Sequence, residues 1–147
     1  MEGRSFFGMF EPKHEDPAML DEFAACGIQK KEDIRQLFVP NFYFGCEADD
    51  PTNAWAFDGR KLPFGARLNA IFSSDIGHWD VPDILEVSEE AHELVEKGLI
   101  TGSDFRDFVF VNPVRLWVGM NRNFFKSTIV ESEVEKLLAS EPVLEAQ

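Results

Sequence analysis

The sequence predicts an α/β fold with two parallel strands and several helices. Two short segments, 41–47 and 68–72, are apolar or aromatic and lie between proline, glycine or acidic turns, as strands do. The connection between them, 48–67, is long enough for the crossover that parallel strands require. Neither segment alternates polar with apolar residues, which predicts strands that are covered on both faces.

The helices that precede the first strand follow from their capping residues. Asp16 is suited to cap a helix, Pro17 to occupy its first position, and Gly27 to end it. A second short helix is expected over 31–38, and Pro40 ends it. The first strand begins directly afterwards.

The chain beyond the second strand is predicted to be helical. From 82 to Gly98 the apolar and small residues recur at spacings of three and four, with glutamates opposite. The residues of this face are Ile84, Leu85, Ser88, Ala91, Leu94 and Val95. The segment TGSD, 101–104, predicts a capping box for a helix with Phe105, Phe108 and Val109 inward. Another helix is expected to begin at Asn112–Pro113, and 132–138 predicts a last one.

Composition excludes several classes of function. The chain has 147 residues, is 44% hydrophobic and carries a net charge of −13, so it predicts a folded domain that binds neither nucleic acid nor anionic membranes. No apolar stretch approaches the roughly 20 residues of a membrane helix, and no signal-peptide pattern is present. The two cysteines, Cys26 and Cys46, are predicted to be reduced, buried thiols of a cytoplasmic protein.

Polar groups gather where the second strand ends. The stretch SSDIGHWD, 73–80, follows it and brings Asp75, His78 and Asp80 close together in sequence. In α/β folds ligand and catalytic groups lie at the carboxyl ends of strands, and these three offer metal ligands and acid–base groups. The spacing alone also fits a structural role, in which Asp75 caps the following turn and His78 packs beneath a helix.

Other motifs narrow the chemistry. Ser73 and Ser74 lack the glycine-flanked turn that a serine nucleophile needs, and no H-x-H, H-E-x-x-H or phosphate-binding loop occurs. Of the other histidines, His14 precedes a helix cap and is expected to be structural. His92 lies among glutamates and is expected to be solvated.

Three segments resemble parts of the amidohydrolase-2 family, in the order that the family has them. FSSDIGHWD, 72–80, resembles the S-D-x-P-H-x-D segment after the eighth strand. NFYFGCEADD, 41–50, resembles the seventh-strand segment, and FRDFVFVNPVRLW, 105–117, resembles the terminal segment with N-P-x-R-L-Y. The family consists of metal-dependent (β/α)8-barrel enzymes that include aminocarboxymuconate-semialdehyde decarboxylase and related hydroxybenzoate-type decarboxylases.

The resemblance implies a role for each matching residue. Asp75 corresponds to the aspartate that binds the catalytic divalent metal, expected to be zinc, and takes part in proton transfer. His78 and Asp80 are expected to support it, and Glu47 is expected to face the pocket from the seventh strand. The remaining matches, Asn112, Pro113 and Arg115, are expected to lock the last helix onto the barrel.

The sequence departs from the family in two ways. Gly77 stands where the family has proline, and the first-strand H-x-H pair and the histidines of the middle strands are absent. A barrel of this type takes about 250 residues. The expectation is therefore a C-terminal fragment that begins at an internal methionine and is inactive alone, with most metal ligands upstream.

As such a fragment, residues 1–147 form a single partial barrel domain. Its parts are a helical lead-in over 1–39, the last two strand–helix units over 40–121, and a C-terminal helix and tail over 122–147. The complete enzyme is expected to be a hydrolase or decarboxylase of a small carboxylated, aromatic substrate.

Two alternatives remain open at this point. In the first, the chain is a non-catalytic binding module whose Phe-rich segment 1–12 docks on a partner. In the second, it is a barrel fragment that another chain completes. Homo-oligomerisation is left open as well.

Overall fold

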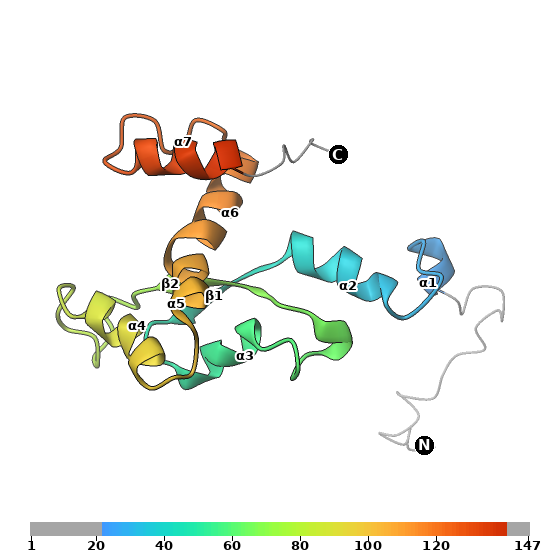
Figure 1. Cartoon of the computed structure of the whole chain (residues 1–147), viewed down its shortest axis with the longest axis horizontal. Helices are drawn as coiled ribbons and strands as arrows, with labels where there is room; N and C mark the ends of the chain where they lie inside the picture. The colour runs from blue at the N-terminus through green and yellow to red at the C-terminus, as the bar shows by residue number, and fades with distance from the viewer. Residues whose placement is uncertain (1–21, 141–147) are drawn as a thin grey trace, which may run out of the picture. The chain divides into compact units, whose positions relative to one another are not determined.

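The computed structural model describes residues 22–140, which fall into two units that divide after Gln36 (Figure 1). In the first unit, α1 (Glu22–Ala25) is followed by Gly27, whose φ of +73° lies in the left-handed region that glycine adopts freely. Helix α2 (Asp33–Phe38) spans the division between the units. It agrees with the helix predicted over 31–38.

Part of the sequence prediction falls outside the described residues: the helix start at Asp16 and Pro17, the Phe-rich segment 1–12, and His14. Both cysteines are described. Cys26 is exposed, so the prediction that it is buried is wrong. Cys46 is half-buried in the first strand, where burial raises the pKa of its thiol.

The second unit holds both strands and most of the helices. Its order is a 3-10 turn (Val39–Asn41), β1 (Tyr43–Glu47), a 3-10 turn (Pro51–Asn53), α3 (Ala54–Phe57), a 3-10 turn (Pro63–Gly65), β2 (Asn69–Ser73), α4 (Val87–Glu96), α5 (Gly102–Arg106), a π-helical turn (Asp107–Val111), α6 (Asn112–Met120) and α7 (Glu131–Ser140). The predicted α/β class is confirmed.

The two strands pair in parallel, as predicted. Their register places Tyr43 opposite Asn69 and Glu47 opposite Ser73. The connection between the strands contains α3 and forms the crossover. Because parallel strands end at the same edge, the segments that follow Glu47 and Ser73 begin side by side.

Helices pack against one face of this strand pair. Its core cluster joins the crossover helix, the second strand and the helices that follow: Phe57, Ala70, Leu94, Ile100 and Phe108. Cys46 and Phe72, which are opposite each other in register, pack against the same cluster.

The other face of the strand pair is open in the described part of the chain. Side chains alternate along a strand, so this face carries Tyr43, Gly45, Glu47, Asn69, Ile71 and Ser73. All six are half-buried or exposed, and within residues 22–140 none belongs to a core cluster. The prediction that both faces are covered is therefore wrong for the described residues.

Helix α4 begins later than its apolar pattern predicted. Residues 84–86 form a turn, and Asp83 accepts a hydrogen bond from the backbone N–H of Leu85 at 2.8 Å. Ile84 and Leu85 are 62% and 81% exposed, so their predicted inward position is wrong. Ala91 and Leu94 are buried as predicted.

Helices α5 and α6 form one continuous rod over 102–120 instead of two helices with a break at Asn112. Thr101 and Asp104 form the predicted capping box at the start of α5. The helix then widens into the π-helical turn, in which the N–H of Asn112 bonds the carbonyl of Asp107. Pro113 has no N–H to donate, and a local widening is one way for a helix to accommodate it.

Helix α6 leads from the strand pair to α7, which appears in red in Figure 1. A second core cluster holds the two helices together through Val111, Val114, Val134 and Leu137. Within residues 22–140, no helix combines the length and apolar character that crossing a membrane requires.

Candidate metal and acid–base site

The loop after β2 turns back on itself. Asp75 and Gly77 have φ values of +50° and +95°, both in the left-handed region. Backbone hydrogen bonds then close the turn, from the N–H of His78 to the carbonyl of Asp75 at 3.1 Å and from Gly77 to Val81 at 3.3 Å. This compact turn brings side chains from positions 75, 78 and 80 together.

Three side chains converge on the loop. The Nδ1 atom of His78 lies 2.5 Å from an oxygen of Asp80 and 3.5 Å from an oxygen of Asp75. One donor atom from each of the three lies within 4.8 Å of the other two. The side chain of His78 is 52% exposed, so the alternative in which it packs beneath a helix is wrong.

The carboxylates of Asp75 and Asp80 favour the charged form of the imidazole. The hydrogen bond with Asp80 raises the pKa of His78, and the negative charges of Asp80, Asp75 and Glu47 raise it further against some desolvation. The same hydrogen bond lowers the pKa of Asp80.

Glu47 ends β1 and belongs to the same electrostatic group. Partial desolvation raises the pKa of its carboxyl, and the negative charges of Asp75, Asp49 and Asp80 raise it further, while His78 opposes them. Glu47 is exposed and lies opposite Ser73 in the strand register. The carboxyl ends of both strands thus contribute to one acidic site.

The donor set fits part of a site for a divalent cation. Both short distances end at Nδ1 of His78, which lies 2.5 Å from Asp80 and 3.5 Å from Asp75. A ring nitrogen that bonds Asp80 cannot coordinate a cation at the same time, which leaves Nε2 as the nitrogen that could do so. A divalent cation would then be held by Nε2 of His78 and a carboxylate oxygen of Asp75, with Asp80 orienting the ring.

The residues of the terminal motif lie on the rod of helices. Asn112 is buried and donates a hydrogen bond from its side-chain amide to the backbone oxygen of Ala70, in the middle of β2, at 2.9 Å. Pro113 is in the first turn of α6, and Arg115 is exposed on the same helix. The hydrogen bond of Asn112 attaches this rod to the strand pair.

Sequence reasoning missed Arg67. Its guanidinium donates to the carbonyl of Phe57 at 2.6 Å and to Asp104 at 2.5 Å, so it joins the crossover to the start of α5. Burial raises the pKa of Asp104, but the hydrogen bonds from Arg67 and Thr101 outweigh it and leave that pKa lowered. Local sequence around Arg67 carries no signal for contacts this far apart in the chain.

Sequence reasoning also underestimated His92. Its side chain is 50% exposed, but its ring stands edge-on to Phe105, with 5.3 Å between ring centroids. Its Nδ1 atom lies 3.3 Å from a carboxylate oxygen of Glu96. The histidine therefore lies at the side of a pocket and is not simply solvated.

The chain was compared with protein-family models, with curated proteins and with solved structures, and none of the three comparisons found a match.

Proposed function

We propose that this chain is the C-terminal part of an amidohydrolase-2-type barrel enzyme, a metal-dependent hydrolase or decarboxylase of a small carboxylated, aromatic substrate. The observation that carries the proposal is the convergence of Asp75, His78 and Asp80 directly after a parallel strand. This is the place where barrel enzymes hold their catalytic groups. The chain alone, with few of the ligands, is expected to be inactive.

The arrangement of the helices supports a barrel origin. The crossover helix α3 and the following helix α4 pack against the same face of the strand pair, through Phe57 and Leu94. Barrels have all helices outside and side chains of the strands inside, whereas doubly wound sheets carry helices on both faces. The open face, with Glu47 and Ser73 at its carboxyl end, then corresponds to the barrel interior.

The incomplete sheet supports the same proposal. A two-stranded sheet is marginal by itself, and both strands have an outer edge that no strand among residues 22–140 covers. Further strands of a barrel would cover these edges and supply the remaining metal ligands. The absent H-x-H pair would come from the first of them.

Each side chain of the site has a task in this enzyme. Asp75 and His78 would hold a divalent cation, expected to be zinc, which supplies Lewis-acid polarisation of the substrate when bound. Asp80 orients the imidazole through its hydrogen bond at 2.5 Å. Asp75 would also move a proton to or from the substrate, and Glu47 would face the same pocket from the end of β1.

Calorimetric titration with zinc tests the metal assignment on this chain. We expect measurable binding that Asp75→Asn or His78→Ala abolishes, because each removes one of two neighbouring ligands. Glu135→Gln, at an exposed position on α7, is the matched control and should bind as the parent does. Equal zinc affinity in all four proteins would contradict the assignment.

The reading frame upstream of Met1 tests the origin of the chain. We expect it to continue and to encode an H-x-H segment at the first strand. In the resulting longer enzyme, Asp75→Asn should abolish turnover of a carboxylated aromatic substrate while leaving the fold intact by circular dichroism. Unchanged turnover would remove Asp75 from the catalytic group.

The open sheet face favours one alternative, a barrel fragment that pairs with another chain. The half-buried Ile71 and Tyr43 on that face would then contact the partner. Sedimentation velocity of the tagged chain, isolated together with whatever protein remains bound to it, separates the two proposals. A stable complex with a separate protein that supplies further strands would favour the alternative.

A further inference from the structure

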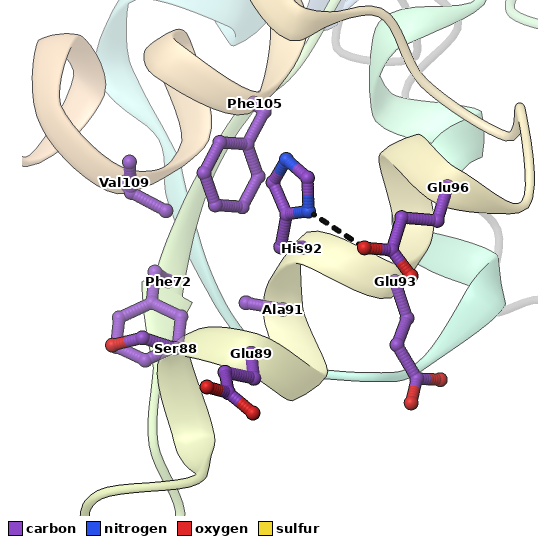
Figure 2. A pocket seen from close by; sticks show the side chains of 9 residues that line it. All are labelled: Phe72, Ser88, Glu89, Ala91, His92, Glu93, Glu96, Phe105 and Val109. Atoms are coloured by element: carbon purple, nitrogen blue, oxygen red, sulfur yellow. Dashed lines mark hydrogen bonds and ion pairs between the residues drawn. The ribbon is translucent and has the colours of Figure 1, made fainter.

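A pocket of ≈ 780 Å³ opens on the helix-covered face of the strand pair (Figure 2). It lies between α4, the end of β2, and the helical segment formed by α5 and the π-helical turn. Four apolar side chains form its walls: Phe72, Ala91, Phe105 and Val109. The volume is within the range of about 300–1,000 Å³ that small-molecule sites occupy.

This pocket is separate from the metal and acid–base site. Phe72 packs against the helix-side core, so its side chain is on the face opposite to the neighbouring Ser73. Ser73 and Glu47 belong to the open face. A ligand in the pocket would therefore not compete with a ligand of the loop 74–81.

Carboxylates line one side of the pocket, along α4. Glu89, Glu93 and Glu96 all extend from α4 beside the opening (Figure 2). Glu93 is paired with Lys97 at 2.5 Å, and Glu96 contacts His92 at 3.3 Å.

The carboxylate of Glu89 has no hydrogen-bond or ion-pair partner among residues 22–140. It is therefore the group most ready to accept a cation. The net charge of −13 strengthens the negative potential at this position.

The aromatic walls complement the carboxylates. Phe105 presents its ring to the pocket with His92 perpendicular to it, so one part of the opening is lined by aromatic surface (Figure 2). Aromatic faces attract both flat apolar groups and cations. Ser88 adds a hydroxyl at the opening.

We propose that this pocket binds a small organic cation with an aromatic body, of the arylalkylamine class. The aromatic body packs against Phe72, Phe105 and Val109, and the ammonium group pairs with Glu89 at the opening. A neutral analogue keeps the apolar contacts but loses the ion pair. An anionic analogue is repelled by the three glutamates.

Titration followed by ¹H–¹⁵N correlation spectra tests the proposal with three indoles of similar shape. Tryptamine is the cationic probe, tryptophol the neutral one and indole-3-acetate the anionic one. We expect tryptamine to bind at least fivefold more tightly than tryptophol, and indole-3-acetate to bind most weakly. The shifted resonances should belong to α4 and to residues 105–109.

Two variants locate the interactions. Glu89→Gln should reduce the affinity for tryptamine to that for tryptophol and leave tryptophol unchanged, whereas Glu135→Gln should change neither. Val109→Trp, at a surface position that is 36% exposed, should fill the pocket and abolish binding of both.

Three results would overturn the proposal. These are equal affinity for the three indoles, tryptamine binding that survives Glu89→Gln unchanged, and shifts confined to another part of the chain. Sedimentation velocity tests the other possible occupant of the pocket, a second copy of the chain. A dimer that Val109→Trp dissociates would assign the pocket to a second copy of the chain.

Discussion

The side-chain amide of Asn112 donates a hydrogen bond to the backbone oxygen of Ala70 across 42 positions of sequence, and both residues are buried. This bond attaches the long helical rod to the middle of the second strand. It also supplies a donor to a strand carbonyl in the interior of the protein. Together with the packing of Phe108 on Ala70 and Phe72, this amide fixes the position of the rod relative to β2.

Removal of that amide should destabilise the second unit. Asn112→Ala leaves the carbonyl of Ala70 without its donor in a buried position, which costs about 1–3 kcal/mol. Chemical denaturation measures the loss. Asn123→Ala, at an exposed position after α6, is the matched control and should change stability little. Equal effects of the two substitutions would show that the bond contributes nothing.

Gly77 sets the shape of the candidate site. Its φ of +95° is unavailable to proline and strained for other residues, while open space surrounds the position of a Cβ atom. Gly77→Ala should therefore cost about 1 kcal/mol from backbone strain alone. Gly102→Ala, where φ is ordinary and the space is also open, should be neutral or stabilising in the same denaturation experiment.

The φ angle of Gly77 marks a difference between this loop and the family segment that it resembles. Proline, which the family has at this position, has φ near −65°. The loop of this chain must therefore follow a different path from a loop with proline, although the order of aspartate, histidine and aspartate is retained. Gly77→Pro should disrupt the loop and abolish zinc binding if Asp75 and His78 are ligands, which the calorimetric titration above would register.

His78 should titrate above the ordinary histidine value. Its hydrogen bond with Asp80 raises the pKa of the ring. In an NMR titration, the midpoint of the change in its ring proton shifts should therefore lie above pH 6.5. Asp80→Asn should lower that midpoint more than Asp75→Asn, because Asp75 acts only through its charge at 3.5 Å. An equal or opposite order would contradict the geometry of the loop.

The raised pKa of His78 also determines how the stability of the fold depends on pH. Because the folded pKa of His78 is raised, its pairing stabilises the fold fully below the unfolded value of about 6.5. The contribution is lost as pH rises through the folded pKa. Zinc needs the neutral ring, so zinc binding should release a proton and strengthen over the same rise in pH.

The sequence predicted elements whose signals are local. The parallel strands, the capping box of Thr101 and Asp104, and the buried face of α4 at Ala91 and Leu94 follow from residues within a few positions of one another. The start of α4 was misplaced because apolar residues at 84 and 85 continue the helical period although turns hold them in solvent.

Long-range features could not be predicted in the same way. The bond from Asn112 to Ala70 and the pocket between α4 and the π-helical turn depend on packing between segments far apart in the chain. For the candidate site, local spacing named Asp75, His78 and Asp80. It did not reveal that both carboxylates meet the same ring nitrogen, which depends on the left-handed turn at Asp75 and Gly77.

Arg67 supplies a last test, because it connects three parts of the second unit. Its guanidinium bonds the carbonyl that ends α3, at Phe57, and the carboxylate of Asp104 that caps α5. Arg67→Ala removes both bonds and should cost about 1–2 kcal/mol, reduced by the half-exposure of the side chain. Arg67→Lys should recover only part of it, because an ammonium does not reproduce the two-armed geometry.

A matched surface arginine and the pH dependence separate this network from an ordinary ion pair. Arg60 is 91% exposed and pairs with Asp58, so Arg60→Ala should leave stability nearly unchanged. The folded pKa of Asp104 is lowered, so its contribution is present above its unfolded pKa and is lost as pH falls through the folded value. Arg67→Ala should therefore destabilise the chain at pH 7 more than under acidic conditions in which Asp104 is protonated. A cost that did not shrink in acid would attribute the effect of Arg67 to its bond with Phe57 alone.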